Sequence, residues 1–95
     1  MWGCITITFY LENYTLVVAH YYSIDFHNEE YNKNFFTHIM SMINGVNILQ
    51  IRIFAPTDIG VLKNEKISAN GVLKSLEMIE KMNFKFNEII FMEGK

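Results

Sequence analysis

The segment 3–22, GCITITFYLENYTLVVAHYY, has a pattern that predicts two strands joined by a tight turn. Residues 3–10 alternate between apolar and polar side chains, and residues 14–22 are rich in β-branched and aromatic side chains; both patterns are typical of strands. The polar interruption between them is Glu12-Asn13, which suits a two-residue hairpin turn. The sequence therefore predicts an antiparallel hairpin.

A two-residue turn would fix the register of this hairpin by pairing Phe9 with Leu16 and Ile5 with His20. Because neighbouring side chains in a strand point to opposite faces, this register separates a core face from an open face. The expected core face carries Ile5, Ile7, Phe9, Leu16 and Val18, with His20 at its end. The expected open face carries Thr6, Thr8, Tyr10, Thr15, Val17, Ala19 and Tyr21.

The segment after the hairpin predicts a helix that packs on the sheet. Asp25 or Asn28 can cap its first turn, where Glu29 and Glu30 interact favourably with the positive end of the helix dipole. Asn44, followed by a glycine, ends it. Its apolar residues recur at helical spacing and predict a buried stripe. They are Phe35, Phe36, Ile39, Met40 and Ile43.

The rest of the chain predicts a strand, a second helix and a last strand. The third strand covers residues 46–54, and the connection 56–67 has the composition of a loop and receives no assigned structure. Ser68 or Asn70 can cap the second helix, and the last strand covers residues 85–92. The side chains expected on the inner faces of these elements include Leu49, Ile51, Ile53, Val72, Leu73, Leu76 and Ile79.

This order of elements, β-β-α-β-α-β, predicts an α+β fold with two layers. About four strands form the sheet, and both helices cover the same face of it. With 95 residues the chain is long enough to bury an apolar core without a disulfide or a structural metal. We therefore expect residues 1–95 to form a single α+β domain.

The composition argues against several classes of function. A formal net charge of −2 and a single arginine, Arg52, offer little counter-charge for a nucleic acid backbone. No apolar stretch reaches the length of about 18 residues that is typical of a membrane span. The single cysteine, Cys4, excludes an intrachain disulfide, and no charged and apolar leader is visible. We therefore expect a cytoplasmic protein that binds neither nucleic acid nor membrane.

The segment 20–27, HYYSIDFH, is the most chemically suggestive part of the chain. His20, Asp25 and His27, with His38 further along, carry side chains that could bind a divalent metal. Their spacing matches no known metal signature, and strand and helix periodicity favours histidines with a structural role. We therefore expect no metal site and no cofactor.

A nucleophilic site at Cys4 is also disfavoured. In the expected register Cys4 lies opposite Tyr21, whereas His20 points to the other face, so no cysteine–histidine dyad forms. The sequence contains no glycine-rich phosphate loop and no nucleophile elbow. We therefore assign no catalytic residue.

The sheet face opposite the helices is the candidate site. Tyrosine and arginine recur at the centres of protein interfaces because they bury a large area and keep a polar end. The partner-binding residues predicted on this face are Thr8, Tyr10, Tyr21, Gln50, Arg52 and Phe54. They predict a small module that binds another protein stoichiometrically, of the immunity-protein or phage-inhibitor type, with a toxin, nuclease or defence component as its partner.

Three alternatives remain open at this stage. The face could be merely solvated, as in many antiparallel sheets. It could belong to a small enzyme or ligand-binding domain for a nucleotide-like molecule, built from Tyr10, Tyr21 and Arg52 with His20 or His27. It could also be covered by a second copy of the chain in a homodimer or larger homo-oligomer.

Overall fold

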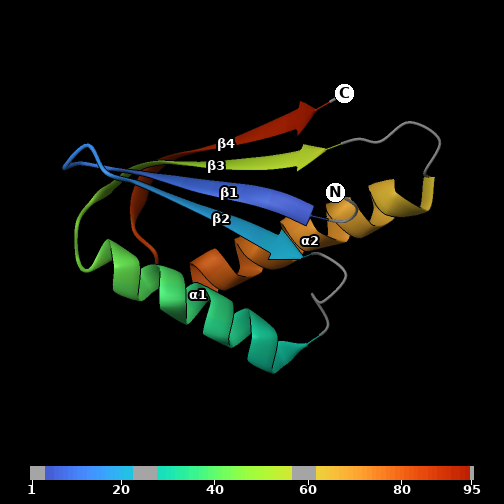
Figure 1. Cartoon of the computed structure of the whole chain (residues 1–95), viewed down its shortest axis with the longest axis horizontal. Helices are drawn as coiled ribbons and strands as arrows, with labels where there is room; N and C mark the ends of the chain where they lie inside the picture. Colours follow the sequence, from blue (N-terminus) through green and yellow to red (C-terminus); the bar gives the residue numbers. More distant parts are fainter. Residues whose placement is uncertain (1–3, 23–27, 57–61, 95) are drawn as a thin grey trace.

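The structure is a computed structural model that describes residues 4–22, 28–56 and 62–94 (Figure 1). Its elements alternate in the predicted order β-β-α-β-α-β. They are β1 (Cys4–Leu11), β2 (Leu16–Tyr22), α1 (Glu29–Ile43), β3 (Ile48–Pro56), α2 (Leu62–Lys81) and β4 (Phe86–Gly94).

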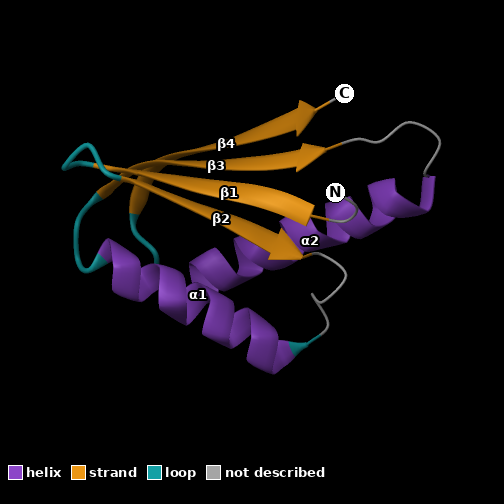
Figure 2. Cartoon of the chain, viewed as in Figure 1, coloured by secondary structure: helices purple, strands orange, loops and turns teal. Residues whose placement is uncertain are grey.

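The strands form one four-stranded mixed sheet in the order β2-β1-β3-β4. β1 pairs antiparallel with both β2 and β3, whereas β3 and β4 are parallel. A parallel pair needs a long crossover connection, and α2 supplies it. Both helices lie against the same face of the sheet (Figure 2), so the predicted α+β sandwich of two layers is confirmed.

The turn between β1 and β2 contains three residues, not the predicted two. The Leu11 N–H donates to the Thr15 carbonyl at 2.9 Å, and the Tyr14 N–H donates to the Leu11 carbonyl at 3.1 Å. Tyr14 takes a left-handed conformation with φ of 65°. These are the features of a type I turn followed by a left-handed residue, the commonest three-residue hairpin. The predicted turn at Glu12-Asn13 is therefore wrong by one residue.

This extra residue shifts the register of β2 and reverses its two faces. Ile5 pairs with Tyr21 and not with His20, so the predicted pairing is wrong. Because the side-chain period of a strand is two, a shift of one residue exchanges the buried and exposed sets. Tyr21, predicted on the open face, is fully buried, whereas Leu16 and Val18, predicted in the core, are 56% and 54% exposed.

Tyr21 of β2 packs against α1 and forms a hydrogen bond with it. Its ring centroid lies 5.0 Å from that of Phe35, 5.6 Å from that of Phe36 and 5.8 Å from that of Tyr31, all on α1. Its hydroxyl donates to Oδ1 of Asn32 at 2.5 Å, and Asn32 is also fully buried. One side chain therefore supplies both apolar contact and a buried polar contact between the two layers.

A second aromatic contact joins α2 to the sheet. The Asn83 backbone is left-handed with φ of 58°, and the Phe84 N–H donates to the Ile79 carbonyl at 3.1 Å, which ends α2 in a Schellman motif. This turn directs Phe84 into the core, where its ring centroid lies 5.8 Å from that of Phe9 and 6.3 Å from that of Phe36. The turn at the end of α2 thus places Phe84 where it packs between the helices and the sheet.

The predicted limits of α1 are confirmed. Oδ1 of Asn28 accepts a hydrogen bond from the Tyr31 N–H at 2.9 Å, and Asn44 ends the helix in the left-handed region with φ of 49°. The predicted cap at Asp25 lies outside the described residues. Met40 is 36% exposed, so the expected stripe is narrower than its sequence pattern indicates.

α2 differs more from its prediction. It begins at Leu62, so part of the connection 56–67, for which the sequence predicts no helix or strand, is helical. Its inner face includes the buried residues Gly71 and Ser75, whereas Leu73, predicted to face inward, is 63% exposed. Small residues carry little hydrophobic signal, although they allow a helix to approach its neighbours closely.

β3 contains a bulge, and because of it the predicted faces of Ile48 and Leu49 are wrong. Tyr10 pairs with Gln50, but the next residue, Leu11, pairs with Ile48, so Leu49 is the extra residue. Ile48 is consequently buried and Leu49 is 44% exposed, the reverse of the prediction.

The observed register makes a direct stability prediction. Replacing Tyr21 by alanine should lower the free energy of unfolding by about 3–5 kcal/mol, the usual cost of emptying a large aromatic site in a core. Replacing Leu16 by alanine should change it by less than about 1 kcal/mol, because that side chain is largely exposed. Urea denaturation followed by circular dichroism measures both, and equal losses would contradict the register.

One ion-pair cluster crosses from α1 to α2. Nζ of Lys74 lies 3.0 Å from Oε1 of Glu29 and 3.0 Å from Oε2 of Glu77. The hydrogen bond from Lys74, followed by its charge, holds the pKa of Glu29 below the ordinary value of 4.5. The hydrogen bonds that Lys74 donates to Glu29 and Glu77 raise its own pKa above 10.5.

These shifts predict how stability depends on pH. A lowered carboxyl pKa contributes stability above its unfolded value of 4.5, and this contribution is lost as pH falls through the folded pKa of Glu29. The difference in free energy of unfolding between the wild type and Lys74→Met should therefore shrink between neutral pH and about pH 3. Lys85→Met, at an exposed lysine, is the control. A difference that stays constant with pH would count against the ion pair.

Candidate protein-binding face

The face of the sheet opposite the helices forms a regular grid of side chains. Ile51 and Ile53 of β3 are buried against the helices, so the alternate residues of each strand point to the other side. We call this surface the open face. From β2 to β4 its rows are Leu16, Tyr10, Gln50 and Glu88; Val18, Thr8, Arg52 and Ile90; and His20, Thr6, Phe54 and Met92.

A connected polar group occupies the centre of the open face. Nε of Arg52 donates to Oε1 of Gln50 at 2.6 Å, and Nε2 of Gln50 donates to Oε1 of Glu88 at 2.5 Å. The guanidinium carbon of Arg52 lies 4.7 Å from the centroid of the Tyr10 ring, within the range of a cation–π contact. Four side chains from three strands are therefore connected by contacts to one another.

Apolar side chains flank this polar centre on both sides. On β2, Leu16 and Val18 are more than half exposed, and on β4 Met92 is 43% exposed. Phe54 and Ile90 are partly exposed between them and the centre. The open face thus combines a fixed polar centre with an apolar margin.

The structure brings together most of the predicted site residues. Thr8, Tyr10, Gln50, Arg52 and Phe54 all lie on the open face, as the sequence predicted. Tyr21 does not, because the register shift places it in the core.

The residues of the open face that sequence reasoning missed lie on the edge strands. Leu16 and Val18 were placed in the core, because β2 is apolar on both faces and its pattern fits two registers equally well. Glu88, Ile90 and Met92 were not assigned, because the position of β4 beside β3 depends on the strand order.

Two of the candidate metal ligands, His20 and His38, lie in the part of the chain that the structure describes. His20 lies on the open face and not on the core face, with Nδ1 3.5 Å from Oγ1 of Thr6. His38 lies on the exposed side of α1, and Asp25 and His27 lie outside the described residues. Within the part of the chain that the structure describes, no three metal-binding side chains of the histidine, cysteine or carboxylate type lie together.

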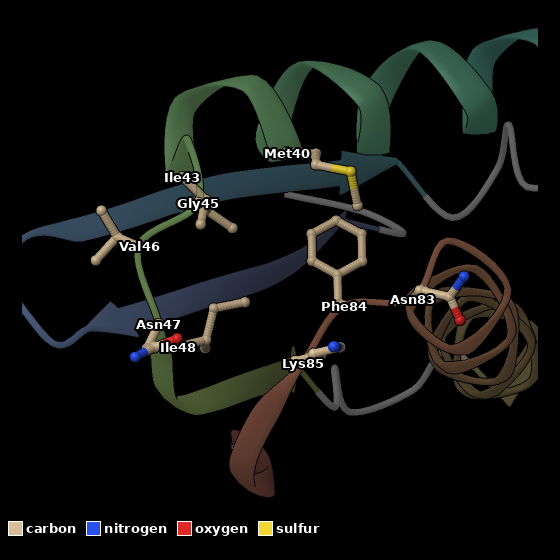
Figure 3. A pocket seen from close by; sticks show the side chains of 9 residues that line it. All are labelled: Met40, Ile43, Gly45, Val46, Asn47, Ile48, Asn83, Phe84 and Lys85. Atoms are coloured by element: carbon tan, nitrogen blue, oxygen red, sulfur yellow. The ribbon is translucent and has the colours of Figure 1, made fainter.

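Two of the cavities that described residues line lie on the helix side of the sheet, near the end of α2. One, of about 190 Å³, lies between the end of α1 and the start of β3, and Figure 3 shows Met40 and Phe84 pointing toward each other across it. The other, of about 460 Å³, lies between α2 and β4. The polar side chains described on the wall of the first are Asn47, Asn83 and Lys85, which do not make a paired acid and base.

Comparison with protein-family models, with curated proteins and with solved structures finds no match to this chain. No helix in the described segments is long and apolar enough to cross a membrane.

The polar centre predicts a measurable signal at Arg52. The chain has one arginine, so its Nε–H gives a single resonance in a nitrogen-correlated NMR spectrum. Replacing Tyr10 by leucine removes the ring beside the guanidinium group, and we expect the resonance to lose its ring-current shift while the amide spectrum of the core stays unchanged. An unchanged Arg52 resonance would show that the ring and the guanidinium group do not stay together in solution.

Proposed function

We propose that this chain is a small protein-binding module that acts stoichiometrically by docking the open face on another protein, in the manner of immunity proteins and phage-encoded inhibitors. The observation that carries this proposal is the fixed arrangement of Arg52, Gln50, Glu88 and Tyr10 at the centre of a face with apolar margins. The single cysteine fits a reducing cytoplasm, which we include in the proposal.

The energetic basis is the behaviour of interface centres. Tyrosine and arginine at the middle of an interface commonly carry most of the binding energy, and surrounding apolar contacts exclude water from them. Because Arg52 and Gln50 are already hydrogen-bonded to neighbours, less side-chain freedom is lost when a partner binds. Leu16 and Val18 would supply the apolar contacts on one margin.

The net charge of the chain indicates which class of partner it would suit. The chain has 10 acidic residues against 8 lysines and arginines, so a basic partner would be attracted over a distance. A nuclease or another toxin that binds nucleic acid has such a surface, because phosphate binding requires lysine and arginine. This class of partner belongs to the proposal.

The alternative is a nucleotide-like ligand held by Tyr10, Tyr21 and Arg52 with His20 or His27. Tyr10, His20 and Arg52 lie on the open face, whereas Tyr21 lies on the helix side of the sheet, so the open face holds only part of this set. The absence of Tyr21 from the open face supports protein docking over this alternative.

Binding measurements on single variants test the proposal. Once a partner is captured from the source cell and purified, Tyr10→Ala and Arg52→Ala should each weaken its binding by about 2 kcal/mol, roughly thirtyfold, in calorimetric titration. Both variants should stay folded, because neither side chain belongs to the buried core.

Leu73→Ala is the matched control. Leu73 is 63% exposed, like the open-face margin, but it lies on α2 in the helix layer. We expect this variant to bind like the wild type. If Tyr10→Ala and Arg52→Ala also bind like the wild type, or if Leu73→Ala alone weakens binding, the open face is not the docking surface.

A further inference from the structure

The two edge strands of the sheet differ in how they are protected. Exposed edge strands tend to pair with other chains, and charged side chains normally prevent this. β4 carries Glu88 and Glu93 and no basic residue. β2, the opposite edge, reads LVVAHYY and contains no lysine, arginine, aspartate or glutamate in its seven residues. β2 is therefore the edge without charged protection.

The register shows which backbone groups of β2 point outward. The Leu11 N–H donates a hydrogen bond to the Thr15 carbonyl, so Leu11 and Thr15 are the first residue pair whose backbone groups point toward each other between β1 and β2. Such pairs alternate along an antiparallel ladder, so Val17 and Ala19 direct their backbone groups to β1. The backbone groups of Leu16 and Val18 therefore point away from the sheet, at its edge.

The side chains of β2 hold this edge in place and expose it at the same time. On the helix side Val17 and Tyr21 are 7% and 0% exposed, so α1 packs the strand firmly against the sheet. On the open face Leu16 and Val18 are 56% and 54% exposed. β2 thus presents a fixed, extended and apolar strand to whatever pairs with it.

We infer that β2 pairs antiparallel with β2 of a second copy of this chain, so that two four-stranded sheets become one continuous sheet about a twofold axis. In a twofold dimer, each charged side chain near the axis lies close to the same side chain of the second chain. β2 brings no lysine, arginine, aspartate or glutamate, whereas pairing through β4 would place Glu88 of each copy on the paired strands. Charge therefore selects β2 as the self-pairing edge.

The geometry of this pairing is self-consistent. With Val18 on the axis, each Val18 faces its own copy across the seam, and both point to the open face. A cross-strand pair of β-branched side chains stabilises a ladder. The dimer would leave both open faces exposed on the same side of one longer sheet, with Leu16 and Val18 near its middle. This inference does not rest on the proposed function, because it concerns the chain alone.

Solution mass and a proline substitution test the inference. Light scattering after gel filtration at micromolar concentration should give the wild type twice the chain mass of 11.2 kDa. Val18→Pro removes an outward N–H and places a ring where the second strand would pair, a change that edge strands tolerate. We expect this variant to have the mass of one chain, and Val18→Thr, which keeps the N–H and the β-branch, to remain a dimer.

Two separate lysine variants test the inference if the proline variant does not fold. Val18→Lys places two like charges at the seam and should also give the mass of one chain. Met92→Lys is its matched control, because Met92 lies on the same face at the other edge and is 43% exposed. A wild type with the mass of one chain, a Val18→Lys variant that remains a dimer, or dissociation by Met92→Lys alone would each overturn the inference.

Discussion

The three-residue turn at Glu12, Asn13 and Tyr14 constrains the register between β1 and β2, and with it the face that each side chain of β2 occupies. A two-residue hairpin turn of the commonest type needs positive φ at both central residues, whereas the observed turn needs it only at Tyr14, whose φ is 65°. Each left-handed non-glycine residue costs about 1 kcal/mol or more. Oδ1 of Asn13 also accepts a hydrogen bond from the Thr15 N–H at 3.2 Å. The three-residue turn is therefore the less strained choice.

The turn alone does not decide the register, because the core has to agree with it. Either register of β2 would bury three side chains of mainly apolar character, so hydrophobic burial discriminates weakly. The difference is Tyr21, whose ring contacts three aromatic rings of α1 and whose hydroxyl has Asn32 as an acceptor. In the other register Tyr21 would be exposed, and the face of β2 toward Asn32 would carry His20. A buried polar pair thus selects between two similar apolar faces.

The sequence pattern was sufficient to predict the helices and strands, but not to predict which face of β2 and α2 is buried. The caps at Asn28 and Asn44 were readable because each acts within a few residues of itself. The faces of β2 were not readable, because LVVAHYY has no polar alternation to mark one side. The inner face of α2 was missed for a related reason: Ser75 is buried with its hydroxyl donating to the Gly71 carbonyl at 2.6 Å, and neither residue looks like a core residue in a hydrophobic pattern. Most of the candidate site could be predicted because β1 and β3 alternate clearly.

The ambiguity that hid the register of β2 is also the origin of its exposed surface. A strand that is apolar on both faces must expose one set when it buries the other, and burying Tyr21 leaves Leu16 and Val18 outside. In a lone chain this exposure, on an edge without charge, promotes association. The fixed group around Arg52 lies beside it on the same face, where it adds directional contacts to a surface that is otherwise merely apolar. In the proposed function, the strand would favour association and the polar centre would restrict the partners of the open face to those that can match it.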